Sequence, residues 1–459
     1  MNEKKRTMIY GGVAVFLALL AFITGPRRVT PDAFLDEGEL FFPNFTDPNA
    51  ATTLEVIDYD AETGSAVPFK VTFKDGKWTI PSHYDYPADG KDRLAKTAAS
   101  VIGIRKDEFR TDNVADYEAL GVIDPLDETN TSLKGRGQRI TIKGKNDEVL
   151  ADLIISKKEI EGREHYRYVR IPDQKRVYAS KMNIDISTKF SDWIESDLLK
   201  VNKSEITQVI LKDYSINERT GTVNQRDVVV LDKKDDDKWV ANKMKSDQEV
   251  DKTKMNDLLR ALDELKIVGV RPKPAGLSES LRKLSGEVSM TQESMLSLQS
   301  KGYYFTRDGQ LLSNEGEVQA RTKDGVIYTL RFGEVVYGSG LAVSAGVESD
   351  DQKEDNKKGE NRYLFITTSF DASQFKEPPK PRNTDFTTKP DSLWTKADKK
   401  NKELQDKHDE WQKKIENGQK RSDELNARFA KWYYVIPASS FDKLHLTRKD
   451  LVKKKKENT

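Results

Sequence analysis

Apolar and polar residues alternate in short runs along most of the chain, and these runs predict strands rather than long helices. Residues 54–59 and 69–73 alternate in the manner of half-buried strands. Asp75 and Gly76 mark a turn before residues 77–80, which indicates a hairpin. A helix should follow Gly90, because apolar residues then recur at spacings of three and four. The expected buried face of that helix carries Leu94, Ala98 and Val101.

The same order of elements returns later in the chain. Residues 206–211 and 227–231 again read as strands, and a second helix places Met255, Leu258, Leu259, Leu262 and Leu265 on one face. Trp78 and Trp239 stand at the same point of the two series, as do Asp89 and Asp251. The later strands also pair across the series: 148–155 with 325–332, 167–171 with 362–366, and 177–178 with 434–435.

This repetition predicts an α+β fold made of two tandem repeats, at residues 51–202 and 203–452. Each repeat should hold a mainly antiparallel sheet and one principal helix, because the links between its strands are short. The second repeat differs by a long insertion at a hairpin tip, residues 377–432. Residues 377–382 are rich in proline and should be extended. Residues from about 396 to 432 have the composition of a helix.

The inserted helix carries the residues that we select as candidate partner-binding residues. Apolar side chains recur there at heptad spacing, with interruptions at Gly418 and Ser422. Two other interpretations stay open: the arm packs on its own sheet, or Asn417-Gly418 forms a turn between two shorter helices. The candidate contact residues are Leu404, Trp411, Ile415, Leu425 and Phe429.

The N-terminus predicts a membrane anchor. Residues 8–24 contain no charge and are preceded by Lys4, Lys5 and Arg6. A stretch of about 17–25 apolar residues can span a bilayer as a helix, and positive charge before it favours a cytoplasmic N-terminus. A cleaved signal peptide and a buried core helix are the alternatives. We therefore expect an anchor at 1–28, a linker at 29–50, and a single-pass protein of the inner membrane whose soluble part is periplasmic.

Composition narrows the classes of function. The 459 residues include 77 Lys+Arg against 76 Asp+Glu, so no overall field favours nucleic acid, and nucleic acid is not an expected partner. There is no cysteine, which excludes disulfides, thiol nucleophiles and cysteine-ligated metals. A basic tail at 453–459 should be solvated.

A search for catalytic chemistry yields no motif. The four histidines, His83, His165, His408 and His445, have none of the spacings of a metal site, and the acidic runs at 232–237 and 348–354 do not fit a calcium loop. The segment 337–346 is rich in Gly and Ser but matches no phosphate-binding or nucleophile motif, so we expect a hairpin loop. We therefore expect no catalytic, cofactor-binding or metal-binding residue.

Several short motifs of the first repeat resemble a known bacterial family, the domain of unknown function 4340 family. They are 78–80, 88–90, 120–125, 168–170, 177–178 and 192–199. The family usually reads Gly-Leu-Asp-Asp-Pro near residue 120, whereas this chain has Ile123 in place of one acid. The resemblance implies an N-terminally anchored envelope protein that is often associated with ABC-type exporters, and it supplies no catalytic residue.

These observations favour a non-catalytic envelope binding or scaffold protein, an accessory subunit of a membrane complex such as an ABC-type exporter. Its partners would be the membrane and other membrane or envelope proteins. A binder of cell-wall or envelope polysaccharide is the first alternative. A carboxylate-dependent hydrolase is the second, because paired acids meet only in the folded chain.

Overall fold

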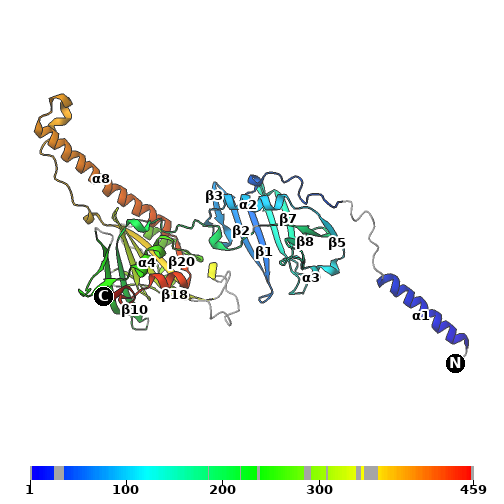
Figure 1. Cartoon of the computed structure of the whole chain (residues 1–459). Helices are drawn as coiled ribbons and strands as arrows, with labels where there is room; N and C mark the ends of the chain where they lie inside the picture. The colour runs from blue at the N-terminus through cyan, green and yellow to red at the C-terminus, as the bar shows by residue number, and fades with distance from the viewer. Residues whose placement is uncertain are drawn as a thin grey trace. The chain divides into compact units, whose positions relative to one another are not determined.

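The computed structural model shows a mixed α+β protein with large antiparallel sheets, as the sequence predicts (Figure 1). Two compact units are formed, each from two chain segments. Unit 1 comprises Met1–Val67 and Leu94–Asp185, and unit 2 comprises Pro68–Arg93 and Ile186–Thr459. The structure describes residues 3–24, 36–184, 186–217, 219–234, 238–283, 291–306, 309–337, 343–345 and 360–455.

The N-terminal segment forms helix α1, Glu3–Thr24. The side chains described between Met8 and Leu20 are exposed. Within the described residues, none of the helices combines the length and the apolar character needed to cross a bilayer. The membrane anchor therefore stays a prediction.

Unit 1 is built on antiparallel strands in the order β1-β6-β7-β8-β9-β5. Apolar residues on alternate positions of these strands are buried; Val56 of β1, for example, lies opposite Ile140 of β6. Helix α2, Lys91–Ile102, buries Leu94, Ala98 and Val101, the face that the sequence predicts. A short helix α3 is Tyr117–Leu120. The strands are β1 Thr53–Asp60, β5 Glu108–Thr111, β6 Gln138–Lys143, β7 Val149–Ile155, β8 Tyr166–Arg170 and β9 Val177–Lys181.

Unit 2 is built on a sheet of eight strands in the order β12-β11-β10-β17-β18-β19-β20-β14. Its register is antiparallel at every pairing. The strands are β10 Ile206–Asn217, β11 Thr222–Lys233, β12 Trp239–Ala241, β14 Gly269–Pro272, β17 Glu317–Thr322, β18 Val326–Val336, β19 Asn361–Phe370 and β20 Trp432–Ile436.

Helices and two small sheets complete unit 2. Helix α4 is Lys252–Asp263, and it buries Met255, Leu258, Leu259 and Leu262 as expected. The pair β13 (Gln248–Val250) and β21 (Val452–Lys454) places Lys453 and Lys454 of the expected tail in a strand. The other elements are α5 Ala275–Lys283, α6 Gln292–Gln299, α8 Lys396–Phe429, α9 Ala438–Leu444, α10 Arg448–Leu451, β15 Tyr303–Phe305 and β16 Leu311–Ser313.

The segments that the sequence aligns occupy equivalent places in the two units. The order β1-β6-β7-β8-β9-β5 of unit 1 corresponds strand by strand to β10-β17-β18-β19-β20-β14 of unit 2. In both, the strand after the principal helix pairs with the last strand of the series. The hairpin of β2 (Ser65–Lys74) and β3 (Lys77–Ile80) likewise corresponds to that of β11 and β12.

One segment, residues 68–93, belongs to unit 2 although it precedes most of unit 1 in sequence. It contains β3, β4 (Tyr86–Pro87) and most of β2. Aromatic packing explains this assignment: the ring of Phe69 lies 5.9 Å from Trp193, and that of Tyr86 lies 5.0 Å from Trp432. The compact units therefore differ from the contiguous boundaries at 51–202 and 203–452.

Candidate functional site

The arm of unit 2, defined here as residues 371–431, is inserted between the paired strands β19 and β20. Its helix α8 starts where a capping box satisfies the first turn: Thr395 N donates to Asp398 Oδ2 at 2.9 Å, and Asp398 N donates to Thr395 Oγ1 at 3.2 Å. The helix then runs unbroken for 34 residues through Gly418. The interpretation of Asn417-Gly418 as a turn between two helices is therefore wrong.

The proximal half of α8 packs on its own sheet through small residues. A Cβ atom on Gly418 would lie 2.3 Å from Phe370 Cε2 and 2.6 Å from Asp324 O, so only glycine permits this approach. Ser422 is fully buried four residues later. The two interruptions of the heptad pattern thus mark where the helix contacts β19 and the turn before β18.

The same half of α8 also supplies hydrogen-bond partners to backbone groups at an unpaired edge of the sheet. Strand β20 pairs with β19 only as far as Leu364, which leaves the later backbone groups of β19 without that neighbour. Asn426 replaces it, because its Oδ1 accepts from Thr368 N at 2.8 Å and its Nδ2 donates to Thr368 O at 2.5 Å. The arm thereby covers an edge that could otherwise pair with another chain.

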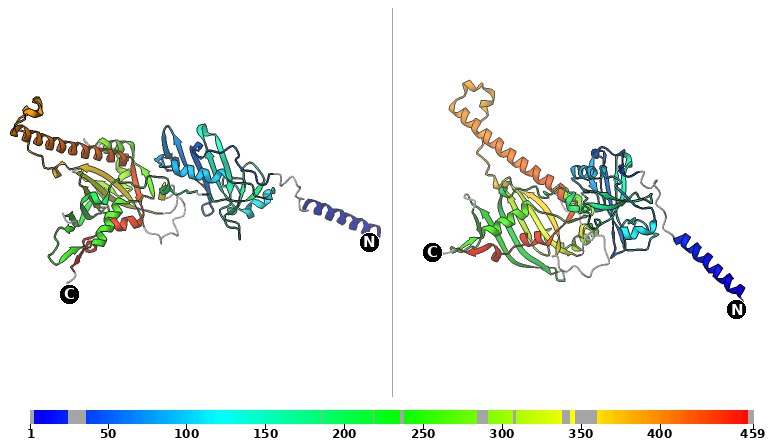
Figure 2. Two further views of the ribbon diagram at one scale, coloured as in Figure 1. Left: turned by 45° about the horizontal axis from the view of Figure 1, so that its top comes forward. Right: turned by 45° about the vertical axis from the view of Figure 1, so that its right-hand side comes forward.

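The distal half of α8 extends beyond the sheet and carries an extended strap instead (Figures 1 and 2). Side chains of the helix bind the backbone of this strap: Trp411 Nε1 donates to Phe375 O at 3.0 Å, and Asn401 Oδ1 accepts from Arg382 N at 3.2 Å. The proline-rich residues 377–382 are neither helix nor strand and belong to the strap. The helix is about 50 Å long, so strap and helix form a stiff projection.

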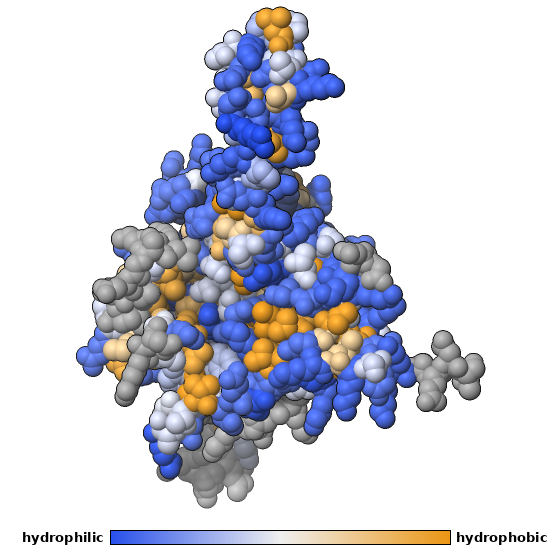
Figure 3. All heavy atoms as spheres, turned by 90° about the vertical axis from the view of Figure 1, so that its left-hand side faces the viewer, coloured by the Kyte–Doolittle hydropathy of each residue, from blue (hydrophilic) through white to orange (hydrophobic). Residues whose placement is uncertain are grey.

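The candidate contact residues divide between the two halves of the helix. Leu425 and Phe429 are 5% and 0% exposed and lie in the interior of unit 2, so they present no surface. Leu404, Trp411 and Ile415 are half-buried and remain at the surface of the arm. Figure 3 shows the arm at the top of the view as mostly hydrophilic, with small apolar areas. A continuous heptad seam open to a partner helix is therefore not present.

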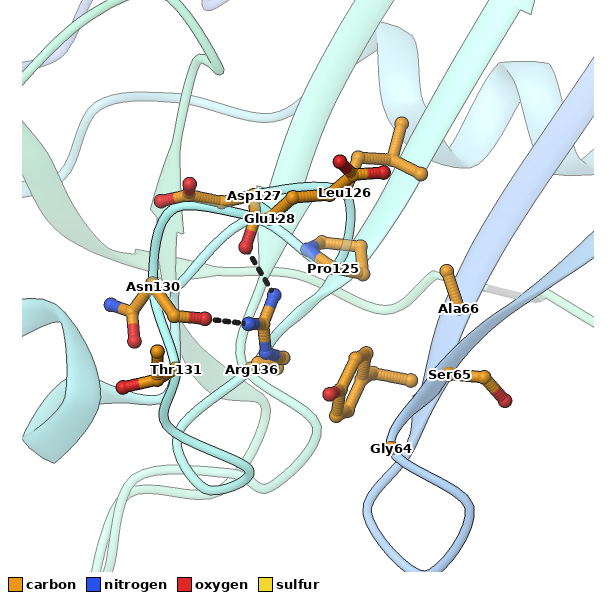
Figure 4. Close-up of a pocket in the computed structure, with 11 residues that line it drawn as sticks. Gly64, Ser65, Ala66, Pro125, Leu126, Asp127, Glu128, Asn130, Thr131 and Arg136 are labelled. Atoms are coloured by element: carbon orange, nitrogen blue, oxygen red, sulfur yellow. Dashed lines mark hydrogen bonds between the residues drawn. The ribbon is translucent and has the colours of Figure 1, made fainter.

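A hollow of about 370 Å³ opens in unit 1 between the β1–β2 turn and the loop that precedes β6 (Figure 4). The residues that line it include hydroxyl, amide and carboxylate side chains, but Figure 4 shows those of Asp127, Asn130 and Thr131 directed away from Arg136. Bonds from Thr129 hold the pKa of Asp127 below its usual value, so this carboxylate is ionised near neutral pH. Its lining residues are Tyr59, Gly64, Ser65, Ala66, Pro125, Leu126, Asp127, Glu128, Asn130, Thr131 and Arg136.

Arg136 organises this loop from within. Its Nε donates to Ser132 O at 2.9 Å, its Nη1 donates to Asp124 O and Asp127 O at 3.0 Å, and its Nη2 donates to Asn130 O. Two of these bonds are drawn in Figure 4. The guanidinium carbon also lies 4.3 Å from the centre of the Tyr59 ring. Backbone carbonyl oxygens thus accept most of the hydrogen bonds that Arg136 can donate. Arg136 therefore stabilises the loop and has few donors left to bind an anion.

Comparison with known families gives one match. Residues 78–280 match the model of a family described as Domain of unknown function (DUF4340). Over these residues the chain is similar to the DUF4340 family. Neither the curated proteins nor the solved structures give a match.

The DUF4340 match runs from β3 to α5, so it includes the loop around Arg136 and excludes the arm. The motif at 120–125 has a structural role there. Gly121 adopts the left-handed conformation, with φ of 70°, that ends α3, and Val122 and Ile123 are buried. Ile123, which replaces an acid of the family pattern, therefore fills the core, and Asp124 pairs with Arg139 at 3.0 Å.

His83, which lies within the matched residues, is a buried group with a shifted pKa that sequence motifs did not single out. Its ring is stacked at 4.7 Å on Phe190, and its Nδ1 lies 3.0 Å from Ser82 Oγ. Burial, with the nearby charge of Arg271, lowers the pKa of His83 to about 4 from 6.5. The turn that holds it is unusual, because the next two residues, Tyr84 and Asp85, both have positive φ.

The buried state of His83 predicts a loss of stability in acid. Between pH 6.5 and 4 the unfolded chain binds a proton that the folded chain does not, so stability falls as pH falls through this window. The full loss is about 3 kcal/mol, at about 1.4 kcal/mol per pKa unit. Urea unfolding near pH 7 and near pH 4.5 should show a smaller acid loss for His83→Phe than for the unchanged chain. The exposed His165→Phe is the matched control, and an equal acid loss in all three would contradict the assignment.

Lys273 binds the C-terminal end of α8, at the base of the arm. Its Nζ donates to Phe429 O at 3.0 Å, near the C-terminus of α8, and lies 3.9 Å from the centre of the Phe365 ring. Desolvation lowers the pKa of Lys273 well below its usual value. The hydrogen bond to the end of α8 gives this lysine a structural role. Across the described part of the chain, no three His, Asp or Glu side chains are grouped so that they could hold a metal ion.

Proposed function

We propose that this protein is a non-catalytic binding or scaffold protein of the cell envelope, an accessory subunit of a membrane complex such as an ABC-type exporter. The observation that carries the proposal is the arm. A 34-residue helix, braced by its own strap, extends from between two neighbouring strands, and its distal half does not pack on the sheet. Stiff projections of this kind suit contact with another macromolecule better than chemistry on a small substrate.

The remaining parts fit the same role. In this proposal α1 is the single membrane anchor, with a cytoplasmic N-terminus and a periplasmic body, which the uncharged residues 8–24 support. The two repeats are copies of one module, which the shared strand order supports. The arm, present in the second module only, supplies the contact. Protease added to intact spheroplasts should degrade the body, and full protection would refute this topology.

The arm surface is tested with point variants that leave the sheet untouched. We expect Leu404→Ala, Trp411→Ala and Ile415→Ala together to reduce recovery of membrane proteins after cross-linking in intact cells by about tenfold. The reason is that they remove the apolar groups still at the arm surface. The matched control is Lys407→Ala, Lys413→Ala and Glu416→Ala, which changes exposed positions of the same helix. Equal recovery with both triple variants would contradict the arm as contact site.

A polysaccharide ligand is the second candidate, and one observation favours it. The residues that line the hollow beside Arg136 carry hydroxyl, amide and carboxylate groups and an aromatic ring, which are the types of group that bind sugars. Retention of the full chain on purified wall material, reduced by Asn130→Ala and Thr131→Val, would support this function. The control Lys134→Ala lies in the same loop but outside the hollow.

A further inference from the structure

The tip of the arm, defined as residues 376–402, concentrates positive charge. It holds eight Lys or Arg and four Asp or Glu, a net charge of +4, whereas the whole chain has a net charge of +1. The remaining residues therefore carry −3. Seven of the eight cations are exposed, while Asp398, one of the four acids, is buried in the capping box.

Most of these cations form no ion pair with the residues that the structure describes. Lys380, Lys389 and Lys402 form ion pairs, with Glu377, Asp398 and Asp406 respectively. The other five form none with any residue that the structure describes. These five are Lys376, Arg382, Lys396, Lys399 and Lys400.

An apolar side chain stands among these charges on a fixed support. Leu393 is 68% exposed in the turn Asp391–Leu393. Next to it, Trp394 packs edge-on against the buried Phe386, with ring centres 6.1 Å apart. The indole Nε1 donates to Phe386 O at 3.2 Å and to Lys389 O at 3.1 Å. The tip is thus a small folded lobe with an exposed leucine, a half-buried tryptophan and a set of exposed lysines.

We propose that the tip of the arm binds the surface of an anionic lipid bilayer, with Leu393 inserted among the headgroups and the lysines paired with lipid phosphates or carboxylates. Charge complementarity selects this occupant, because the tip carries a net charge of +4 and five of its cations form no ion pair. An exposed leucine beside tryptophan is the side-chain pattern of a membrane interface. Each cation near an anionic surface contributes about a factor of five to binding, so the contact is reversible and sensitive to salt.

The absence of cysteine from the chain makes a direct test possible. Full-length protein carrying Ser392→Cys is labelled with an environment-sensitive dye and reconstituted in vesicles with or without phosphatidylglycerol. We expect a blue shift and quenching by brominated lipid in the anionic vesicles only, reversed by high salt. A dye at Lys413→Cys, exposed on the middle of the same helix, should show neither change.

Charge variants identify the groups responsible. Lys396→Glu, Lys399→Glu and Lys400→Glu together should weaken the signal at least 100-fold, and the acidic residues suit the N-terminus of α8, so folding is retained. The matched control is Lys413→Glu, Lys414→Glu and Lys420→Glu on the proximal half. Equal signals from the two triple variants, or a water-exposed dye at position 392 in anionic vesicles, would overturn the proposal. A blue shift seen only when other envelope proteins are added would assign the tip to an acidic protein instead.

Discussion

Replacement of Arg136 by methionine should destabilise unit 1 by about 3 kcal/mol and release the loop between α3 and β6. The substitution removes the donors that four buried or half-buried carbonyl oxygens share, and each unsatisfied acceptor costs about 1–3 kcal/mol where water cannot reach it. It also removes the cation from the Tyr59 ring. Thermal unfolding gives the loss of stability, and hydrogen exchange at Ile123 and Gly137 gives the release of the loop.

The matched control for this prediction is Arg163→Met in the same unit. Arg163 is on the surface, where it pairs with Glu108 at 2.7 Å and lies over Tyr166. Exposed ion pairs contribute about 0–1 kcal/mol, so this variant should unfold almost as the unchanged chain does. Equal losses for the two variants would show that the carbonyl cage around Arg136 does not hold the loop.

Gly418→Ala should destabilise unit 2 by about 2 kcal/mol, although alanine ordinarily favours a helix over glycine by about 1 kcal/mol. The sign reverses because the added Cβ would overlap Phe370 Cε2 and Asp324 O, and overpacking of this kind costs about 1–3 kcal/mol or more. To avoid the overlap, α8 must move away from β19. That movement weakens the bonds between Asn426 and Thr368, so exchange of the Thr368 amide should rise.

Asn417→Ala is the control for the glycine variant. Asn417 precedes Gly418 in the same helix but is exposed, and there alanine should be neutral or slightly stabilising. If Gly418→Ala were as stable as Asn417→Ala, the close approach of α8 to the sheet would not exist in solution.

Much of this fold could be predicted from local patterns in the sequence. Alternation at residues 54–59 and spacing at Met255–Leu262 are local signals, and they coincide with β1 and α4. The helix expected from composition at about residue 396 starts at Lys396, where Thr395 and Asp398 form a capping box. The paired segments of the two repeats occupy equivalent places in the strand orders, since each pair preserves both its pattern and its place in the series.

The features that local patterns could not predict depend on contacts between residues that are distant in sequence. The grouping of residues 68–93 with unit 2 depends on rings more than a hundred residues away, such as Trp193 for Phe69. Gly418 suggested a break in the helix, whereas it marks a contact with Phe370 that no local signal reveals. For the same reason Leu425 and Phe429 looked like contact residues but fill the interior.

The candidate site, too, was predictable only in the parts that depend on local sequence patterns. The sequence located the arm and its half-buried residues Leu404, Trp411 and Ile415, because an insertion can be read by aligning the repeats. It did not locate Arg136 or His83. The role of Arg136 arises from carbonyl oxygens of a folded loop, and that of His83 from burial beside Phe190 and Arg271.

Shortening the arm tests whether it is the contact with a membrane complex. Phe375 O and Trp411 Nε1 are 3.0 Å apart, so residues 377–410 can be replaced by a short Gly-Ser turn that leaves the proximal helix on its sheet. The shortened chain also carries Trp411→Ala and Ile415→Ala, so that it keeps none of the three apolar groups at the arm surface. Full-length and shortened chains are then cross-linked in intact cells, purified and compared by mass spectrometry. If the arm makes the contact, the full-length chain recovers membrane subunits of an exporter or similar complex and the shortened chain does not. Recovery of the same subunits by both chains would contradict it, and recovery of none by either would favour the envelope polysaccharide as the ligand.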